Sequence, residues 1–328
     1  MAATLLSRRR MLACAAAILG APSIAVPQPR TTTVRLLLGF APGGVLDGVC
    51  RKLAERWTAR TGQPAIVENR QGAAGRLAIA ELVRASADGS SLLLTPASTL
   101  TMYPYVYQRL DYDPLRDLSP VHGVAATCFA LAAGPAVPPS VTGVRELAGW
   151  ARAQGGPLPC GNSGSGGMQH MLATLLAREA RLELTHVPFR GGAPSMQAVA
   201  AGDVPIAMVT ESSARTLHEA RKLRVLATTG VRRTVFPEVA TFQEQGWATL
   251  SQREWFGAFA PARTPAGILE QQAGVLESIL GEPEVRDAWE RLGVLVDSVA
   301  REQLQAAMRQ EHGFWGPVIR QSGFTPQA

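Results

Sequence analysis

Short apolar runs alternate with amphipathic stretches along most of the chain. The first run, Val34–Phe40, is predicted to be a buried strand, and apolar side chains then recur at helical spacing from Val45 to Trp57. Gly62 is expected to end that helix. This alternation of strand and helix is typical of α/β units built on mainly parallel sheets.

The same pattern continues towards the C-terminus. Further strands are predicted at Ala65–Glu68, Leu92–Thr95, Val121–Ala126, Phe129–Ala133, Leu158–Gly161, Leu184–Pro188, Ile206–Val209 and Val225–Thr228. Helices are predicted at Leu77–Ala85, Val144–Gln154, Met168–Arg181 and Pro194–Ala201, and the tail from Ala266 on is expected to be mostly helical. No internal repeat and no low-complexity linker interrupts the pattern.

Length and composition indicate a globular protein of two domains. The chain has 328 residues, which is more than one ordinary core holds, and 46% of them are apolar against 18% charged. No apolar run reaches the roughly 20 residues that a membrane span needs.

The N-terminus has the layout of a cleaved signal peptide. Arg8, Arg9 and Arg10 precede the apolar run Met11–Gly20, and small residues end at Ala25. We expect residues 1–25 to be removed and the mature protein to be periplasmic. The segment around Arg8 resembles a twin-arginine signal, and an ordinary secretory signal is the alternative.

Charge and metal-binding residues exclude several function classes. The net charge is +6, three of these charges belong to the N-terminal arginines, and no Lys/Arg block follows, so nucleic acid is not expected as a partner. The five histidines show no metal-ligand spacing. We therefore expect neither a metal nor a cofactor.

The first candidate binding motif is a strand end, two glycines and a helix start. Such a helix start offers free backbone N–H groups and a positive dipole end to an anion. A nucleotide P-loop is excluded because no Gly-Lys-Ser/Thr follows. Asp47 either stabilises its own helix, with Arg51 at i+4, or binds a ligand ammonium or orients waters around a ligand carboxylate. The predicted contacts are Phe40, Ala41, Gly43, Gly44, Val45 and Asp47.

The second motif, Cys160–Gly167, repeats this arrangement with a loop of small residues. Its predicted ligand contacts are Asn162, Ser163, Gly164, Ser165 and Gly166. A serine hydrolase using Ser163 or Ser165 is the alternative, but neither serine has the flanking glycines of a nucleophile elbow. Because no His/Asp partner can be identified either, we do not expect an enzyme, and His170 is interpreted as a helix-face residue.

Two further strand ends carry hydroxyl groups. The third motif is the strand exit Leu94–Thr99, in which Ser98 and Thr99 are the predicted contacts and a capped turn is the alternative to a ligand contact. Thr210, at the end of another strand, is a weaker candidate contact.

Taken in order, these segments resemble the Bug-type (TctC-like) substrate-binding proteins of the tripartite tricarboxylate transporter family. The resemblance covers nearly the whole mature chain. It rests on Ala41–Asp47 with Arg51, Val67–Gly75, Asp88-Gly89, Tyr112–Pro114, Asn162–His170, His186–Pro194, Arg232-Arg233, Phe236–Val239 and Phe256–Pro261.

This resemblance implies an α/β type II periplasmic-binding-protein fold, with two domains, two interdomain crossovers and a central cleft. We expect domain I to comprise residues 30–125 and 250–328, and domain II residues 126–249. The resemblance further implies that the first loop and the loop before His170 hold a carboxylate. The ligand classes of the family are di- and tricarboxylates, acidic amino acids and some aromatic acids.

Some residues differ from the family pattern. Ala41 stands in place of a usual Pro, Gly167 in place of a Ser, Cys160 in place of a Tyr and Pro205 in place of an Asp. The second loop's contacts are therefore less well predicted than the first loop's. We expect a monomer that serves the membrane subunits of a transporter or, alternatively, a sensor receptor.

Overall fold

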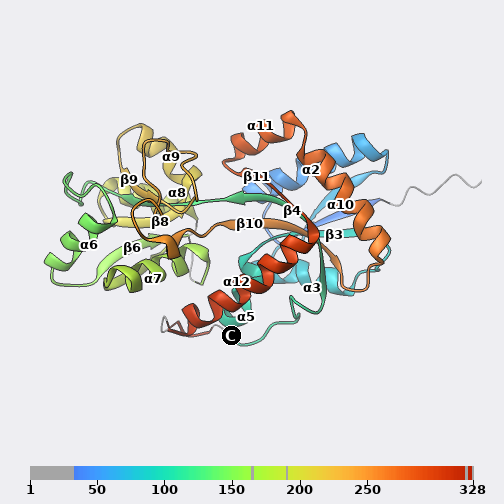
Figure 1. Ribbon diagram of the computed structural model, residues 1–328, viewed down its shortest axis with the longest axis horizontal. Coiled ribbons are helices and arrows are strands. Elements are labelled where there is room, and N and C mark those ends of the chain that lie inside the picture. The colour runs from blue at the N-terminus through green and yellow to red at the C-terminus, as the bar shows by residue number, and fades with distance from the viewer. Residues whose placement is uncertain (1–32, 164–165, 190, 322–323, 327–328) are drawn as a thin grey trace, which may run out of the picture. The chain divides into compact units, whose positions relative to one another are not determined.

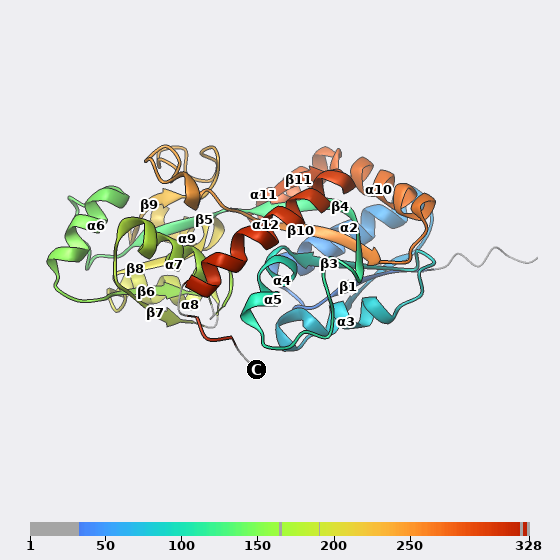
Figure 2. The same ribbon diagram turned by 60° about the horizontal axis from the view of Figure 1, so that its bottom comes forward.

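The structure is a computed structural model that describes residues 33–163, 166–189, 191–321 and 324–326. The predicted signal peptide, residues 1–25, lies outside the described residues. Two sheets organise the described chain (Figures 1 and 2). One has six strands in the order β11-β4-β10-β3-β1-β2, and the other has five in the order β7-β6-β8-β5-β9.

The six-stranded sheet is mixed. Its strands β1, β2 and β3 are parallel, whereas β10 runs antiparallel to β3 and β4, and β11 runs antiparallel to β4. The strand bounds are β1 (Val34–Leu38), β2 (Ala65–Asn69), β3 (Ser91–Pro96), β4 (Leu118–Thr127), β10 (Glu254–Pro261) and β11 (Leu295–Val299). Its helices are α2 (Val45–Thr61), α3 (Arg76–Arg84), α4 (Ser98–Thr101), α5 (Tyr103–Val106), α10 (Ala266–Leu280), α11 (Pro283–Leu292) and α12 (Arg301–Gln321).

The five-stranded sheet is also mixed. Strand β6 is parallel to β7 and β8, and β5 is antiparallel to β8 and β9. The strands are β5 (Phe129–Ala133), β6 (Leu158–Asn162), β7 (Leu184–Pro188), β8 (Ile206–Thr210) and β9 (Arg224–Thr228). The helices are α6 (Val144–Ala153), α7 (Met168–Ala180), α8 (Gly192–Ala201) and α9 (Glu211–Glu219).

Strands made of apolar residues throughout are buried on both faces of their sheet, because successive side chains of a strand point to opposite faces. In β1, Leu36 and Leu38 pack with α2, α10 and α11, whereas Leu37 packs with α3 and α12 on the other face. In β5, Leu131 and Ala130 divide between two clusters in the same way. The apolar runs therefore predict strands that are buried on both sides.

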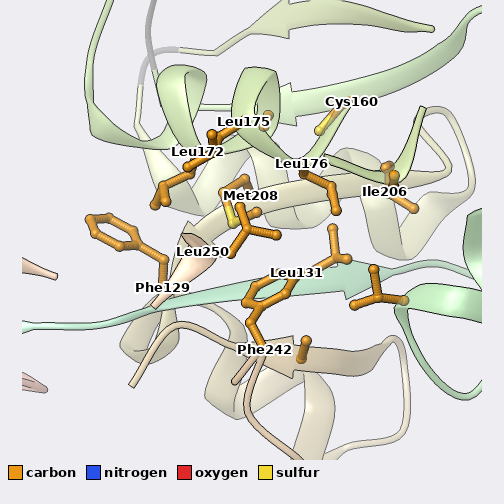
Figure 3. Close-up of a cluster of buried hydrophobic side chains, with 14 of the residues drawn as sticks. Phe129, Leu131, Cys160, Leu172, Leu175, Leu176, Ile206, Met208, Phe242 and Leu250 are labelled. Carbon is orange, nitrogen blue, oxygen red and sulfur yellow. The ribbon is translucent and has the colours of Figure 1, made fainter. Parts of the chain in front are cut away.

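Figure 3 shows the larger core of the five-stranded sheet, in which Phe129 and Leu131 of β5 face Leu172 and Leu176 of α7. Helix α12, which begins beside the six-stranded sheet, also reaches this core. Its Trp315 is fully buried in the same cluster. The C-terminal helix thus joins the packing of both sheets.

The chain passes from one sheet to the other in two places. Cys128 alone separates β4 from β5, and residues 229–253 lead back from β9 to β10. Strand β4 continues to Thr127, two residues beyond the end of the predicted first segment of domain I. The domain bounds given by the sequence analysis stay a prediction.

A network of ion pairs lies along the outer strand β2. Arg35 of β1 bonds Glu68 at 2.7 Å and also pairs with Glu81 of α3. Arg70 bonds the same two carboxylates at 2.7 and 2.8 Å. Each carboxylate is therefore shared by two guanidinium groups.

The predicted strands and helices from Val34 to Thr228 are all present, with ends that differ by a few residues. Strands β10 and β11 and helices α4, α5 and α9 were not predicted. The tail is mostly helical as expected, but β11 interrupts it. None of the described helices combines the length and the apolar character that crossing a membrane requires.

Candidate functional site

The loop after β1 presents the start of α2 to solvent. Residues 41–45 are all exposed. Gly43 has φ +83°, which suits glycine, whereas Gly44 has φ −76° and an extended backbone. The first hydrogen bond of the helix runs from the Gly48 N–H to the Gly44 carbonyl, at 3.0 Å. The N–H groups of Val45 and Leu46 therefore have no acceptor within the helix, as at any helix start.

Asp47 lies beneath this loop and holds it in place. Its carboxylate accepts hydrogen bonds from Gly43 N (2.9 Å), from Arg51 Nε (2.7 Å) and Nη2 (3.1 Å), and from Asn69 Nδ2 (2.9 Å). The residue is only 2% exposed. Burial opposes ionisation, but the hydrogen bonds from Arg51, Gly43 and Asn69 outweigh it and lower the pKa of Asp47 to about 2.

Two roles for Asp47 were left open by the sequence, a structural one and one in ligand binding. The geometry favours the structural role. Both carboxylate oxygens already have donors from the protein. The Gly43 N–H, predicted as a ligand donor, is used by Asp47 in this conformation. The direct contact of either residue with a ligand stays a prediction.

Asp47→Asn is expected to lower the free energy of unfolding by about 1–3 kcal/mol at neutral pH, because the charged acceptor of several donors is lost. The folded-state pKa of about 2 lies below the ordinary 3.8. The stabilisation is therefore complete above pH 3.8 and disappears as the pH falls towards 2. Urea unfolding at several pH values measures this.

Equal stability of the wild type and Asp47→Asn at pH 7 would contradict the structural role of Asp47. Asp111→Asn, at an exposed position, is the control.

Asn69 and Tyr103 link the first loop to the third motif. Asn69 donates to the Phe40 carbonyl at 3.0 Å as well as to Asp47. Phe40 also lies against Gly75, where an added Cβ would come within 3.2 Å of its ring. Tyr103 of α5 donates to the Ala74 carbonyl at 3.2 Å. The loops after β1, β2 and β3 thus form one connected group.

The two hydroxyl residues of the third motif are buried. Thr99 is 0% exposed, bonds Thr95 Oγ1 at 2.8 Å and donates to the Pro96 carbonyl at 2.8 Å. The Ser98 N–H donates to Glu254 Oε1 at 2.7 Å. Both residues therefore serve the packing of this turn, as in the capped-turn alternative. Their contact with a ligand stays a prediction.

The second motif lies against α5. Strand β6 ends at the buried Asn162, and Gly166 has φ +75°. A Cβ on Gly166 would lie 2.8 Å from Val106 Cγ1. Gly166 of the second motif therefore packs against α5. Gly164 and Ser165, two of the predicted contacts, lie outside the described residues.

His170 fixes the end of this loop. Its Nδ1 accepts the Gly166 N–H at 3.0 Å, and its ring lies 3.9 Å from that of His186 between centroids. Burial, and to a smaller degree His186, lowers the pKa of His170 to about 4. A neutral ring can accept at Nδ1, so His170 supports the loop from the first turn of α7.

Thr210 and Ser163 belong to a second polar group. Thr210 Oγ1 and Ser213 Oγ are 2.7 Å apart at the start of α9. A Cβ on Gly192 would lie 2.4 Å from Ser213 Oγ and 3.8 Å from Ser163 Oγ. These hydroxyls face the same small glycine and therefore lie close together.

The sequence analysis missed three buried carboxyl groups near the points where the chain passes between the sheets. Burial raises the pKa of Glu211, Glu254 and Glu311 to about 7 each. The signal that could have identified Glu254 is its place at the head of the apolar run Trp255–Pro261. Glu211 and Glu311 lie in polar segments that look solvent-facing in sequence.

Comparison with known families gives one match that covers most of the chain. The family described as "Tripartite tricarboxylate transporter family receptor" matches residues 49–324. This match confirms the resemblance that the motifs carry.

Solved structures support the same relationship. The periplasmic binding protein BugD is 26% identical, with a TM-score of 0.74, over 90% of this chain and 99% of BugD. An R. palustris protein solved with adipate is 27% identical, with a TM-score of 0.78, over 92% of this chain and 100% of its own. MatC from Rhodopseudomonas palustris, solved with malate, is 27% identical, with a TM-score of 0.73, over 88% of this chain and 98% of MatC. The predicted two-domain, type II periplasmic-binding-protein fold is thereby confirmed.

Proposed function

Because the chain belongs to the family of tripartite tricarboxylate transporter receptors, we propose that it is a periplasmic solute-binding protein for a small carboxylate-bearing molecule. In this role it binds the ligand and delivers it to the membrane subunits of a transporter. It is a receptor rather than an enzyme. The observation that carries the proposal is the start of α2, where Gly44 and Val45 are exposed above a fixed Asp47 and the N–H groups of Val45 and Leu46 have no acceptor within the helix.

A carboxylate suits this helix start for two physical reasons. The amides and the dipole of α2, a helix of 17 residues, favour negative charge without a buried arginine. Gly44 has no side chain to block the approach, and Asp47 keeps the loop in one conformation. Ser98, Thr99, Thr210 and the loop from Asn162 to Gly166 are proposed to complete the site from neighbouring strand ends.

The relatives favour a linear dicarboxylate among the possible acids. One R. palustris structure contains adipate, and MatC contains malate. Both ligands carry two carboxylates on a short flexible chain. We therefore place dicarboxylates first, ahead of tricarboxylates, acidic amino acids and aromatic acids.

A thermal-shift screen tests the proposal. At about 100 times its dissociation constant, a true ligand should add about 2.7 kcal/mol to the free energy of unfolding. The donors of the α2 site do not titrate, so a simple dicarboxylate should bind equally well from pH 6 to 8. A panel of neutral sugars, matched in concentration, is the control. Stabilisation by a sugar and by no carboxylate would overturn the proposal.

We also expect the protein to be exported to the periplasm and its signal peptide to be removed. Intact-mass measurement on protein from the periplasm should show loss of residues 1–25. Arg8→Lys with Arg9→Lys should strongly impair export if the twin-arginine route is used. Unchanged export of that double variant would assign the general secretory route instead. A full-length cytoplasmic product would contradict export altogether.

A further inference from the structure

Two adjoining cavities lie where the chain passes between the two sheets. Their volumes are about 290 and 660 Å³. They share Ala126, Cys128, Thr234 and Leu295 in their walls, so we treat them together as the hinge cavity. Its walls come from the end of β4, the start of α9, the α11–β11 connection and the return segment before β10.

The hinge cavity is lined by carboxyl groups of which only one oxygen has a partner in the described part of the chain. Glu211 Oε2 accepts from Thr234 Oγ1 at 3.1 Å, and the Val235 N–H also donates to this carboxyl group. Asp297 Oδ1 accepts from Arg253 Nη1 at 2.5 Å, and Glu311 Oε1 from Trp255 Nε1 at 2.7 Å. Glu211 Oε1, Asp297 Oδ2 and Glu311 Oε2 are buried without a donor among the described residues.

Glu211 is the best placed of the three. Only 3% of its surface is exposed, and its backbone N–H donates to the Cys128 carbonyl at 3.0 Å. The side chain is thereby fixed at the first crossing between the sheets. A buried acceptor without a donor is destabilising, and a donor supplied by a bound molecule would remove that penalty.

The charges around the cavity favour a cation over an anion. Four acidic residues line it, namely Glu211, Glu290, Asp297 and Glu311, against three arginines. Of these arginines, Arg215 pairs with Glu219 at 3.5 Å and Arg253 pairs with Asp297, which leaves Glu211, Glu290 and Glu311 against Arg232. Burial raises the pKa of Cys128 to about 12, so this thiol stays neutral.

An organic cation fits better than a metal ion. Among the described residues, no three His, Cys, Asp or Glu side chains are grouped closely enough to hold a metal. An ammonium group brings three donors on one atom, which matches several acceptors that each lack one.

We propose that the hinge cavity binds a primary ammonium group, with Glu211 as its counter-ion and Glu311 as a further acceptor. The ammonium belongs either to the carboxylate ligand itself or to a separate small amine. The first of these sources rests on the proposed function, whereas the second does not. In either case Glu211 determines specificity and does not hold the carboxylate.

Ammonium binding requires the ionised form of Glu211. Because burial raises the pKa of that group to about 7, binding should release a proton and weaken as the pH falls below 7. The groups facing Glu211 are Cys128 on the crossing, Arg215 on α9 and Glu290 on α11. Cys128 stays neutral, so Glu211 carries the pH dependence.

Calorimetry on the mature chain at pH 8 tests this with matched pairs of acids, namely succinate with aspartate, glutarate with glutamate, and adipate with 2-aminoadipate. Methylammonium and putrescine are tested alone. If the ammonium belongs to the ligand, at least one amino acid should bind about tenfold tighter than its partner acid. In Glu211→Gln the ratio of the two affinities should fall to nearly one, while the affinity for the acid without an amino group stays unchanged. If the amine is separate, methylammonium or putrescine should stabilise the wild type and not Glu211→Gln.

Glu270→Gln is the control, because Glu270 is an exposed residue of α10 that lines neither cavity. Glu311→Gln is the second variant should Glu211→Gln fail to fold, and it should reduce the same ratio. An amino-group preference unchanged in both variants, or no response to any ammonium compound, would overturn the inference. If no carboxylate binds at all, the proposed function fails, but the free amines still decide the inference.

Discussion

Gly44→Val should abolish carboxylate binding and leave the fold intact. The backbone of Gly44 has φ −76°, which any residue adopts, and the nearest atom to an added Cβ is the Ala41 carbonyl oxygen at 3.5 Å. Valine therefore fits without strain. Its methyl groups would occupy the approach to the N–H groups of Val45 and Leu46. Losing two hydrogen bonds to a charged group corresponds to about 100-fold or more in affinity.

Calorimetry with the acid found by the screen measures this, and circular dichroism checks the fold. Gly149→Ala is the matched control, because Gly149 lies in α6 with open space around its Cβ position. Gly43 is a poorer choice, since its φ of +83° would strain any side chain. Wild-type affinity in Gly44→Val would show that the ligand binds elsewhere.

Trp315→Ala should destabilise the protein by about 3–5 kcal/mol, the usual cost of removing a fully buried aromatic side chain. Trp315 is 0% exposed and lies in the core of the five-stranded sheet, although α12 begins beside the six-stranded sheet. The substitution removes the largest of the α12 side chains in this core, which also holds Val318 and Ile319.

Urea unfolding at pH 7 measures the loss. Trp315→Phe keeps most of the apolar contact and should cost clearly less than Trp315→Ala. Arg309→Ala is the control on the exposed face of α12, and it should change the free energy of unfolding little. A loss below about 1 kcal/mol in Trp315→Ala would mean that α12 does not pack into this core.

Hydrophobic periodicity predicts much of the fold because strands buried on both faces produce continuous apolar runs. Val34–Leu38 and Phe129–Ala133 are of this kind. Strand β11, Leu295–Val299, is short, half-exposed and placed between two helices, so the helical pattern around it hides it. Strand β10 is fully buried, but its glycine and proline weaken the signal.

The candidate site is only partly predictable for a different reason. The first loop is a local feature, and its glycines and helix start are legible in sequence. Whether Asp47 contacts a ligand or holds the loop depends on Asn69, a partner 22 residues away. The carboxyl groups of the hinge cavity come together only through the fold, since Glu211 is far in sequence from Asp297 and Glu311.

The ion-pair network beside β2 has a consequence for encounters between copies of the chain. Strand β2 ends the six-stranded sheet, pairs only with β1 among the described strands, and leaves Ile66 47% exposed. A bare edge of this kind invites strand addition and aggregation. Another chain pairing there would have to displace or bury Glu68 and Arg70, whose charges are already matched. The charged edge therefore disfavours growth of the sheet by addition of another chain, which the predicted monomer requires.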